Sequence, residues 1–438
     1  DDAGMNSSQN EQDSRHYARA AKVPMLEPAD SAEGLAFAKL AYELSEQFDT
    51  PVFLRMTTRV AHSQSLVSLC SRDEVGVKEY HKNPAKNVMM PAMAKGRHVV
   101  VEERTQKLVQ CAETSPLNRE EMFSTEIGII TSGINYQYCR EAMGENASYL
   151  KLGMVNPLPI EKIKNFAAKV KTLYVVEDLD DVIETHCKKI GISCIGKDIF
   201  SLLGEFSQKT IREKLLCQEP ESFTYPEPIP VRPPVMCAGC PHRASFYAVK
   251  QAMKGKKAVF SGDIGCYTLG NAQPLDMVDT CLCMGADVTI AQGIHRVEPD
   301  TINFSFIGDS TFFASGIPGI INAVYNGTDI VLVVLDNSTT AMTGHQPHPG
   351  TGKTMMGEIT EKVSIEKVLT AIGVRQVTVA NPFELKEAVA AVKSLAEEKG
   401  VKAIIFRSPC IALQKPARIL KVQPERCIGC KRCIRELG

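Results

Sequence analysis

The sequence has almost no net charge, no long apolar run and no leader-like beginning. The formal net charge of its 438 residues is -1, so no basic surface suited to nucleic acid or an anionic membrane is expected. No apolar stretch reaches the roughly 18–20 residues that a membrane-spanning helix needs. The first ten residues, DDAGMNSSQN, contain neither the basic region nor the apolar segment of a signal peptide. We therefore expect a cytoplasmic protein that binds neither nucleic acid nor a membrane.

Strands and helices alternate through much of the chain, which predicts a multi-domain α/β fold with parallel sheets. A helix is predicted over 30–48, capped by Asp30 and Glu33. Its expected apolar face is Leu35, Ala38, Ala41 and Tyr42. The other predicted strands are 51–56, 126–131, 149–155, 172–176, 302–310 and 329–338, and the other helices include 135–143, 160–169 and 181–190.

Proline marks one clear boundary. Residues 219–235 contain six prolines in 17 positions, which predicts a stiff extended linker. A third α/β domain is expected from about 236 to 410, followed by a short cysteine-rich tail. Residues 61–120 are polar and lack clear periodicity, so they are interpreted as linker and connecting helices.

Two strand ends present oxygen donors. The strand 302–310 ends in Gly308-Asp309, and the strand 329–338 ends in Asp336-Asn337. A crossover helix between them would bring both strand ends to one sheet edge, where α/β proteins bind ligands. Carboxylate and amide oxygens suit Mg²⁺, and Gly308 would let a phosphate approach the backbone. Each strand end alone is more often a simple turn, but the pair predicts a magnesium–diphosphate site.

The fifteen cysteines are clustered, which indicates metal or cluster chemistry in a reducing compartment rather than a disulfide framework. Cys237 and Cys240 form a C-x-x-C that could be a redox dithiol, half a zinc site or half a cluster site. Cys266 and Cys410 lie in other loops of the same domain and could equally be small buried apolar residues. Most isolated cysteines have that simpler interpretation: Cys70, Cys111, Cys139, Cys187, Cys194 and Cys217.

The tail carries a second cysteine pattern. Cys427, Cys430 and Cys433 form C-x-x-C-x-x-C, the opening of a bacterial ferredoxin motif. Leu437 occupies the ordinary position of the fourth ligand, so these three thiols make an incomplete second [4Fe–4S] site. We expect the missing ligand, like the beginning of the chain, to lie outside these 438 residues.

The stretches Gly308-Asp309-Ser310 and Asp336-Asn337-Ser338 are similar to the Gly-Asp-Gly…Asn-Asn motif of enzymes that use thiamine diphosphate. Ser310 and Asp336 depart from that motif. The resemblance implies Mg²⁺ ligands at Asp309, Asn337 and the backbone carbonyl of Thr339.

The next stretch, Thr343-Gly344-His345-Gln346, resembles the Thr-Gly-Gly-Gln of 2-oxoacid:ferredoxin oxidoreductases. His345 in place of glycine, and the following 347–352, resemble the indolepyruvate branch. A site role is favoured for His345. For His348, a site role and an exposed loop position are equally good interpretations.

The same resemblance implies that Cys237, Cys240, Cys266 and Cys410 hold one [4Fe–4S] cluster beside thiamine diphosphate. It also implies that the cofactor pocket is lined by Asp263, Gly265, Cys266, Tyr267, Gly285, Gly308, Ser310 and Gly344. The polar segment 7–15 offers Arg15 for a substrate carboxylate, although a solvated helix arginine is the simpler interpretation. The glutamate that activates the cofactor is expected upstream of Asp1.

Over its whole length the chain resembles the large (alpha) subunit of indolepyruvate ferredoxin oxidoreductases, truncated at both ends. This implies oxidative decarboxylation of arylpyruvates to acyl-coenzyme A, with electrons passing through [4Fe–4S] clusters to ferredoxin. It also implies a smaller beta subunit, a hetero-oligomer and inactivity of the fragment alone. The alternatives are another 2-oxoacid:ferredoxin oxidoreductase, a non-oxidative thiamine-dependent decarboxylase or synthase, and an electron-transfer subunit without thiamine.

The resemblance finally implies a domain order. It comprises part of a pyrimidine-binding domain (1–70), a linker (71–120), a transketolase C-terminal-like domain (121–217), the proline-rich linker (218–235), the diphosphate-binding domain (236–412) and the start of a ferredoxin domain (413–438).

Overall fold

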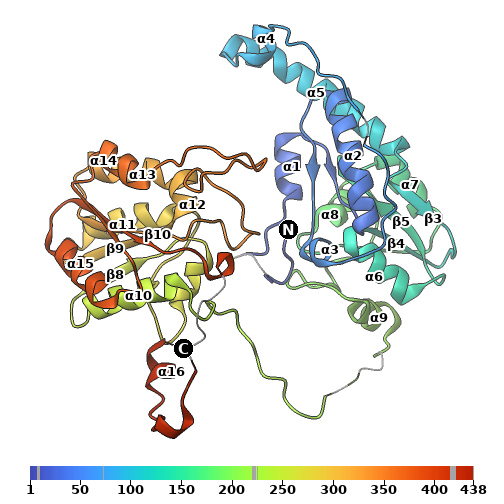
Figure 1. Ribbon diagram of the computed structural model, residues 1–438. Coiled ribbons are helices and arrows are strands. Elements are labelled where there is room, and N and C mark those ends of the chain that lie inside the picture. The colour runs from blue at the N-terminus through green and yellow to red at the C-terminus, as the bar shows by residue number, and fades with distance from the viewer. Residues whose placement is uncertain (7–9, 73, 220–222, 224, 415–420, 438) are drawn as a thin grey trace. The chain divides into compact units, whose positions relative to one another are not determined.

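The computed structural model describes residues 1–438 except 7–9, 73, 220–222, 224, 415–420 and 438. Its contacts divide the chain into two compact units, Asp1–Pro226 and Glu227–Gly438. Both are α/β, with parallel strands and surrounding helices (Figure 1). The predicted fold class is therefore confirmed, and the division between the units falls inside the proline-rich stretch.

The first unit contains two sheets, ordered β3-β5-β4-β7 and β2-β1-β6. In the larger sheet β4 runs parallel to β5 and β7, and β3 is an antiparallel edge strand. The strands of the first unit are β1 Met25–Leu26, β2 Phe53–Leu54, β3 Arg119–Glu121, β4 Ile127–Ser132, β5 Ser148–Leu152, β6 Met154–Asn156 and β7 Thr172–Val176. Its helices are α1 Arg15–Ala21, α2 Ser31–Phe48, α3 Thr58–His62, α4 Pro84–Asn87, α5 Pro91–Thr114, α6 Gly133–Met143, α7 Ile160–Ala167, α8 Val182–Lys189 and α9 Gln208–Leu216.

The strand predicted over 149–155 is two strands in two sheets. The side chain of Asn118 accepts hydrogen bonds from the backbone N–H groups of Gly153 (3.0 Å) and Met154 (2.9 Å). These bonds end β5 and direct β6 toward β1, with which it pairs antiparallel. The ranges 1–70 and 121–217 therefore lie in one compact unit. The apolar pattern does not reveal this break because both halves are buried.

Helix α2 begins as predicted but buries a partly different face. The Asp30 carboxylate caps it by accepting from the N–H of Glu33 at 2.9 Å. Phe37 and Leu44 are buried, and Ala41 packs partly against the same core, whereas Leu35 and Tyr42 are exposed, so the predicted face was only partly correct. Both faces carry apolar residues at helical spacing. The buried face is the one that contacts a core from distant segments: Leu26, Ala112 and Met154.

The polar stretch after β2 contains the expected connecting helices, including α5, which is 24 residues long. Only Leu108 and Ala112 of α5 are buried, both in its C-terminal half. This explains its weak apolar periodicity, because most of the helix contributes nothing to the core.

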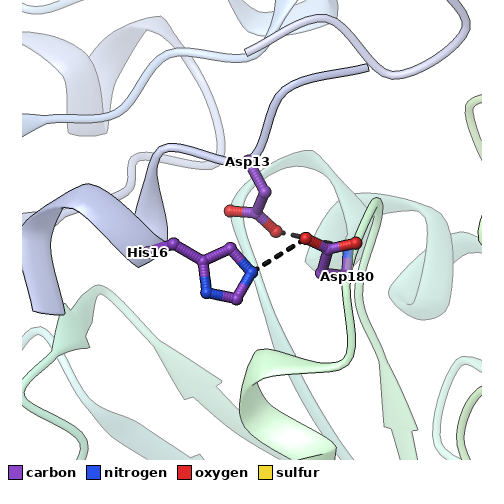
Figure 2. Close-up of side chains that lie close together, drawn as sticks. All are labelled: Asp13, His16 and Asp180. Carbon is purple, nitrogen blue, oxygen red and sulfur yellow. Dashed lines mark hydrogen bonds and ion pairs between the residues drawn. The ribbon is translucent and has the colours of Figure 1, made fainter. Parts of the chain in front are cut away.

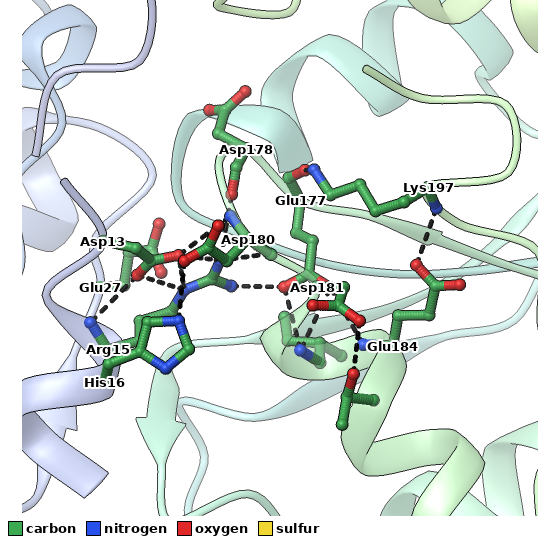
Figure 3. Close-up of polar contacts among 12 residues, drawn as sticks. Asp13, Arg15, His16, Glu27, Glu177, Asp178, Asp180, Asp181, Glu184 and Lys197 are labelled. Carbon is green, nitrogen blue, oxygen red and sulfur yellow. Dashed lines mark hydrogen bonds and ion pairs between the residues drawn. The ribbon is translucent and has the colours of Figure 1, made fainter. Parts of the chain in front are cut away.

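Buried charges hold the first 60 residues to the larger sheet (Figure 3). Arg15 donates to Asp13 through Nε (3.0 Å) and Nη2 (2.6 Å), and to Glu177 through Nη1 at 2.5 Å. All three side chains are at most 2% exposed. Burial by itself would raise the pKa of Asp13, but the hydrogen bonds and charge of Arg15 lower it to about 2. Arg55 continues the network by pairing with Asp1 and Glu27.

The second unit is one parallel sheet, ordered β11-β12-β10-β9-β8. Its strands are β8 Ala258–Ser261, β9 Ile302–Gly308, β10 Ile330–Asp336, β11 Gln376–Ala380 and β12 Val401–Arg407. Its α-helices are α10 Pro241–Ala252, α11 Ala286–Val297, α12 Asp309–Thr311, α13 Ile317–Tyr325, α14 Ile365–Ile372, α15 Leu385–Glu397 and α16 Arg432–Leu437. Short 3₁₀ turns, η1 Cys266–Asn271, η3 Ile411–Leu413 and η4 Pro424–Arg426, and the π-turn η2 Phe312–Gly316 complete it.

Strand β10 is buried on both faces, as its run of apolar residues predicts. Val331, Val333 and Leu335 join a core with α10 and α15. Ile330, Leu332 and Val334 join a second core with α11, α13 and α14. The helices accordingly cover the two sides of the sheet (Figure 1). The carboxyl ends of the central strands are thereby held rigidly at one sheet edge.

The buried network predicts the stability of the first unit. Arg15→Met removes the cation that pairs with the buried carboxylates of Asp13 and Glu177. We therefore expect the free energy of unfolding to fall by about 3–5 kcal/mol. Hydrogen exchange followed by mass spectrometry should show faster exchange in β4 and β7. Arg59→Ala, which removes a half-exposed pair with Glu205, is the matched control and should cost less than about 1 kcal/mol. Equal protection from hydrogen exchange in Arg15→Met and Arg59→Ala would contradict the prediction.

Candidate functional site

The register of β9 and β10 brings the two predicted oxygen donors together. Gly308 pairs with Leu335, so Asp309 lies beside the first residues after β10. Oδ2 of Asp309 accepts the backbone N–H groups of Asn337 (3.1 Å) and Ser338 (2.8 Å). Asp309 and Asn337 are both nearly inaccessible to solvent. The predicted strand–helix–strand arrangement around this edge is confirmed.

The loop after β10 folds back toward Asp309. Ser338 has a left-handed backbone (φ 63°), and Oδ1 of Asn337 accepts the N–H of Thr339 at 3.2 Å. The hydroxyl of Thr340 donates to that of Ser310 at 2.9 Å, which links this loop to the end of β9. Thr339 is buried beside them. Ser310 and Thr339 therefore belong to the same small group as the two predicted ligands.

His348, not His345, reaches the carboxylate. Nε2 of His348 lies 3.1 Å from Oδ2 of Asp309, and both side chains are buried. The His348 ring also stacks on Phe313. His345 is exposed, has a left-handed backbone and follows the exposed Gly344. The preference for His345 over His348 is thus not supported by the geometry, and the sequence spacing alone did not separate the two.

Burial disfavours the charged form of the Asp309 carboxyl, and a bound cation would stabilise that form. Burial raises the pKa of Asp309 above its usual range, although the contact with His348 opposes the shift. The donors predicted from the sequence at this edge are all oxygens: the Asp309 carboxylate, the Asn337 amide and the Thr339 backbone. Mg²⁺ prefers such donors and keeps phosphate oxygens in its shell. The residues present therefore fit a magnesium–diphosphate group.

Two of the predicted pocket glycines, Gly265 and Gly308, make room for the Tyr267 ring. Gly308 has an ordinary φ of -75°, and a Cβ there would overlap the Tyr267 ring, as would one at Gly265. The Tyr267 hydroxyl donates to Oδ2 of Asp263 at 2.7 Å, while Oδ1 of Asp263 accepts the N–H of Gly285 at 3.0 Å. Gly308 thus meets a packing requirement, while its expected role of admitting a phosphate stays a prediction, and these predicted pocket residues form one packed cluster.

Two buried ionisable residues, Asp287 and His242, were not predicted from the sequence. Asp287, in the second position of α11, is fully buried and accepts from the hydroxyl of Ser305 at 2.5 Å. Burial, and then the charge of Asp263, raise the pKa of Asp287 to about 8. His242 is buried with its ring edge-on to Tyr267, and burial lowers its pKa to about 4. An acidic residue within the small-residue stretch 285–293 was the available signal for Asp287.

The four predicted cluster cysteines share one neighbourhood. Cys240 precedes α10 and Cys266 begins η1. Burial raises the pKa of Cys240, and the charges of Cys237 and Cys266 add to the shift. Burial raises that of Cys266 too, with Cys410 and Cys237 contributing. The N–H of Cys410 donates to the carbonyl of Asn337 at 2.9 Å, so this group adjoins the oxygen donors.

Backbone donors also influence the thiol of Cys240. The N–H groups of His242 and Arg243 bond the Cys240 sulfur and lower its pKa against the effect of burial. Gly239 has a left-handed φ of 76°, which turns the C-x-x-C loop. Such donors stabilise a thiolate, the form that binds iron. Cys427, Cys430 and Cys433 of the tail are all exposed.

A further group could in principle hold an ion. Among the described residues, only Asp13, His16 and Asp180 bring three possible ligand atoms within 4.8 Å of one another (Figure 2). Both Asp13 oxygens are already bound to Arg15, whose charge opposes a cation.

Arg15 is not available to a substrate. Its guanidinium is 1% exposed and is bound by Asp13, Glu177 and the backbone carbonyls of Asp178 and Asp180. The suggested role in binding a substrate carboxylate is therefore corrected to a structural one. Residues 7–9 of the polar segment lie outside the described residues.

Comparison with known proteins decides the family. Indolepyruvate oxidoreductase subunit IorA of Archaeoglobus fulgidus is 38% identical over 99% of this chain and 74% of that protein. The subunit of the same name from Methanothermobacter marburgensis is 39% identical over 100% of this chain and 75% of that protein. The chain belongs to the family of indolepyruvate oxidoreductase IorA subunits.

Residues 263–406 also match the family model described as thiamine pyrophosphate enzyme, C-terminal TPP binding domain. This match assigns thiamine pyrophosphate (thiamine diphosphate) to the second unit, and it includes Asp263, Asp309, Asn337 and His348. A solved 2-oxoglutarate:ferredoxin oxidoreductase from Magnetococcus marinus is 20% identical over 41% of this chain and 65% of that chain, with a TM-score of 0.36. No helix among the described residues has both the length and the apolar character to cross a bilayer.

The packing of Tyr267 yields a test of the glycine requirement. Gly308→Ala places a methyl group into the Tyr267 ring and should destabilise the second unit by about 1–3 kcal/mol, with weaker binding of thiamine diphosphate. Gly293→Ala is the control, because a Cβ there meets nothing within 4 Å on the exposed side of α11; it should be neutral or slightly stabilising. Calorimetric melting and cofactor titration measure both. Equal melting temperatures of Gly308→Ala and the unmodified protein would show that the Tyr267 ring can move without loss of stability.

Proposed function

We propose that the chain is the thiamine-diphosphate-binding subunit of an indolepyruvate ferredoxin oxidoreductase. The proposed reaction is the oxidative decarboxylation of indolepyruvate and related aryl 2-oxoacids to acyl-coenzyme A, with electrons passing to ferredoxin. The observation that carries this is the contact between two groups of ligands. Cys410 is hydrogen-bonded through its backbone to Asn337 at 2.9 Å, so proposed cluster ligands adjoin the proposed metal ligands.

In this proposal Asp309, Asn337 and the carbonyl of Thr339 would hold Mg²⁺ with the diphosphate. Ser310, Gly344 and Gly285 would line the same end of the cofactor, and the Asp263–Tyr267 pair would form its rigid floor. The thiolates of Cys237, Cys240, Cys266 and Cys410 would hold a [4Fe–4S] cluster. Cys427, Cys430 and Cys433 would supply three ligands of a second cluster.

When bound, thiamine diphosphate supplies the electron sink for cleavage of a 2-oxoacid, and the clusters carry electrons singly. The chain's own contribution is placement. Asp309 and Asn337 would hold one end of the cofactor, and Tyr267 and Asp263, which are buried, would exclude water from this part of the site. Burial, and then the neighbouring Asp263, raise the pKa of Asp287 to about 8, so its carboxyl keeps its proton to a higher pH than an ordinary aspartate does.

Two of the alternative functions leave either the oxygen donors or the cysteines unexplained. A non-oxidative thiamine-dependent decarboxylase or synthase needs no cluster, which leaves the cysteine quartet unexplained. An electron-transfer subunit without thiamine leaves Asp309 and Asn337 unexplained. Another 2-oxoacid:ferredoxin oxidoreductase uses both groups and differs only in substrate.

The relatives are named as subunits, which supports a hetero-oligomer. We propose a smaller beta subunit, ferredoxin and coenzyme A as its partners. The free thiols fit a reducing cytoplasm.

The metal-ligand proposal predicts the effect of Asp309→Ala in the full-length complex. Anaerobic viologen reduction should be faster with indolepyruvate and phenylpyruvate than with pyruvate in the unmodified enzyme. The variant should lose turnover with all three because the diphosphate loses its cation, while the cluster EPR signal persists. Asp300→Ala, at an exposed position, is the control and should leave turnover unchanged. Normal turnover in Asp309→Ala would refute the assignment, and a preference for pyruvate would refute the substrate class.

The cluster proposal predicts the effect of Cys266→Ala. Removing one of four thiolates should eliminate or alter one reduced [4Fe–4S] EPR signal and lower the iron content by one cluster. Cys217→Ala, at an exposed cysteine of the first unit, should leave the spin count and the iron content unchanged. The same spin count and g values in Cys266→Ala would exclude Cys266 as a ligand.

A further inference from the structure

A cavity in the first unit is lined by basic residues that the proposed function does not use. It has a volume of about 210 Å³ and lies between helices α1 and α8 and the end of β6. Helix α1 contributes Arg15 and Arg19, which are four residues apart and therefore share one face. Helix α8 contributes four residues whose spacing is also that of a single helix face: Val182, Thr185, His186 and Lys189.

Three basic groups of this cavity have no counter-charge. Neither the Arg19 guanidinium nor the Lys189 amine has a hydrogen-bond or ion-pair partner among the described residues. Nε2 of His186 is buried and has no hydrogen-bond partner either. None of the described residues that line the cavity is acidic. Arg15 differs from the other three, because Asp13 and Glu177 already bind its guanidinium.

The three unpaired groups influence one another. Burial, and then the charges of Lys189 and Arg19, lower the pKa of His186 below its ordinary value. Like charges that are held together without a counter-ion repel, and the repulsion is stronger where protein walls limit screening by water. A bound anion would remove this repulsion, and it would also give Nε2 of His186 an acceptor.

We propose that this cavity binds the phosphate group of a small organic phosphate, with Arg19, His186 and Lys189 as the groups that hold it. A phosphate monoester suits three converging basic groups, because it carries nearly two negative charges and three acceptor oxygens. Guanidinium also binds phosphate through two parallel hydrogen bonds. The other walls are apolar and fit an organic body attached to the phosphate: Val109, Val155, Leu158, Ile160 and Val182.

Calorimetric titration of the full-length complex tests this site. Saturating thiamine diphosphate and Mg²⁺ are present throughout, so that the cofactor site does not compete for the probe. Adenosine 5′-monophosphate should bind, and adenosine, which lacks the phosphate, should bind at least about tenfold more weakly. Arg19→Gln and Lys189→Gln should each weaken binding of the monophosphate about tenfold or more, because each removes a hydrogen bond to a charged group.

Lys188→Gln is the matched control. Lys188 is next to Lys189 in α8, but it pairs with Glu184 at 2.6 Å and does not line the cavity. This variant should leave the affinity for adenosine monophosphate unchanged. His186→Phe keeps a ring in the cavity and removes Nε2, so it should weaken binding while the melting temperature stays that of the unmodified complex.

Coenzyme A also carries phosphate groups, so a second titration identifies the source of the phosphate. If Arg19→Gln and Lys189→Gln weaken binding of coenzyme A and of adenosine monophosphate alike, the site serves coenzyme A. If they weaken only the binding of the monophosphate, the site serves a separate organic phosphate.

Two results would overturn the proposal. The first is that neither adenosine monophosphate nor coenzyme A has an affinity that depends on Arg19 or Lys189, including the case in which neither ligand binds. The second is that Lys189→Gln lowers the melting temperature and leaves the affinities unchanged. Lys189 would then only stabilise the last turn of α8 through the helix dipole.

Discussion

The parallel pairing of β9 with β10 is the constraint on which the candidate site depends. Because Gly308 pairs with Leu335, the carboxylate of Asp309 meets the first two backbone N–H groups after β10. A buried carboxylate needs such donors, since an unpaired charge in the interior is strongly destabilising. The same contacts place Asn337 and Thr339 beside it, and the Cys410 N–H then binds the Asn337 carbonyl. One strand register therefore brings together the oxygen donors and one of the thiols.

Tyr267 acts as the second organising element of this unit. Its ring occupies the space left by the absent side chains of Gly265 and Gly308, and its hydroxyl is held by Asp263. Asp263 in turn binds the backbone at the beginning of α11. Tyr267, Gly265 and Gly308 thus form a close-packed stack in which glycine is required for volume rather than for an unusual φ. The first unit uses a different device, a buried Arg15 saturated by carboxylates and carbonyls.

Sequence reasoning succeeded where the signal was local and failed where burial was decided elsewhere. It placed β7, β9, β10 and α6 within a few residues. The predicted face of α2 was only partly correct, because apolar residues follow both faces and the contacts with Leu26, Ala112 and Met154 determine which is covered. Residues 149–155 were predicted as one strand, because the break depends on the side chain of Asn118. Arg15 was predicted to bind a substrate carboxylate, because nothing near it in the sequence reveals that Glu177 binds its guanidinium.

What the sequence by itself determined is the chemistry of the donors: an aspartate and an asparagine at the ends of two buried strands, and cysteines in cluster-like spacing. Residue type and strand pattern are properties of neighbours in the chain, so they can be predicted without a fold. Only the tertiary structure decided that His348 rather than His345 meets Asp309, that Gly308 makes room for Tyr267, and that Asp287 is buried near Asp263. Those outcomes depend on burial and on contacts between segments remote in sequence, which no local pattern contains.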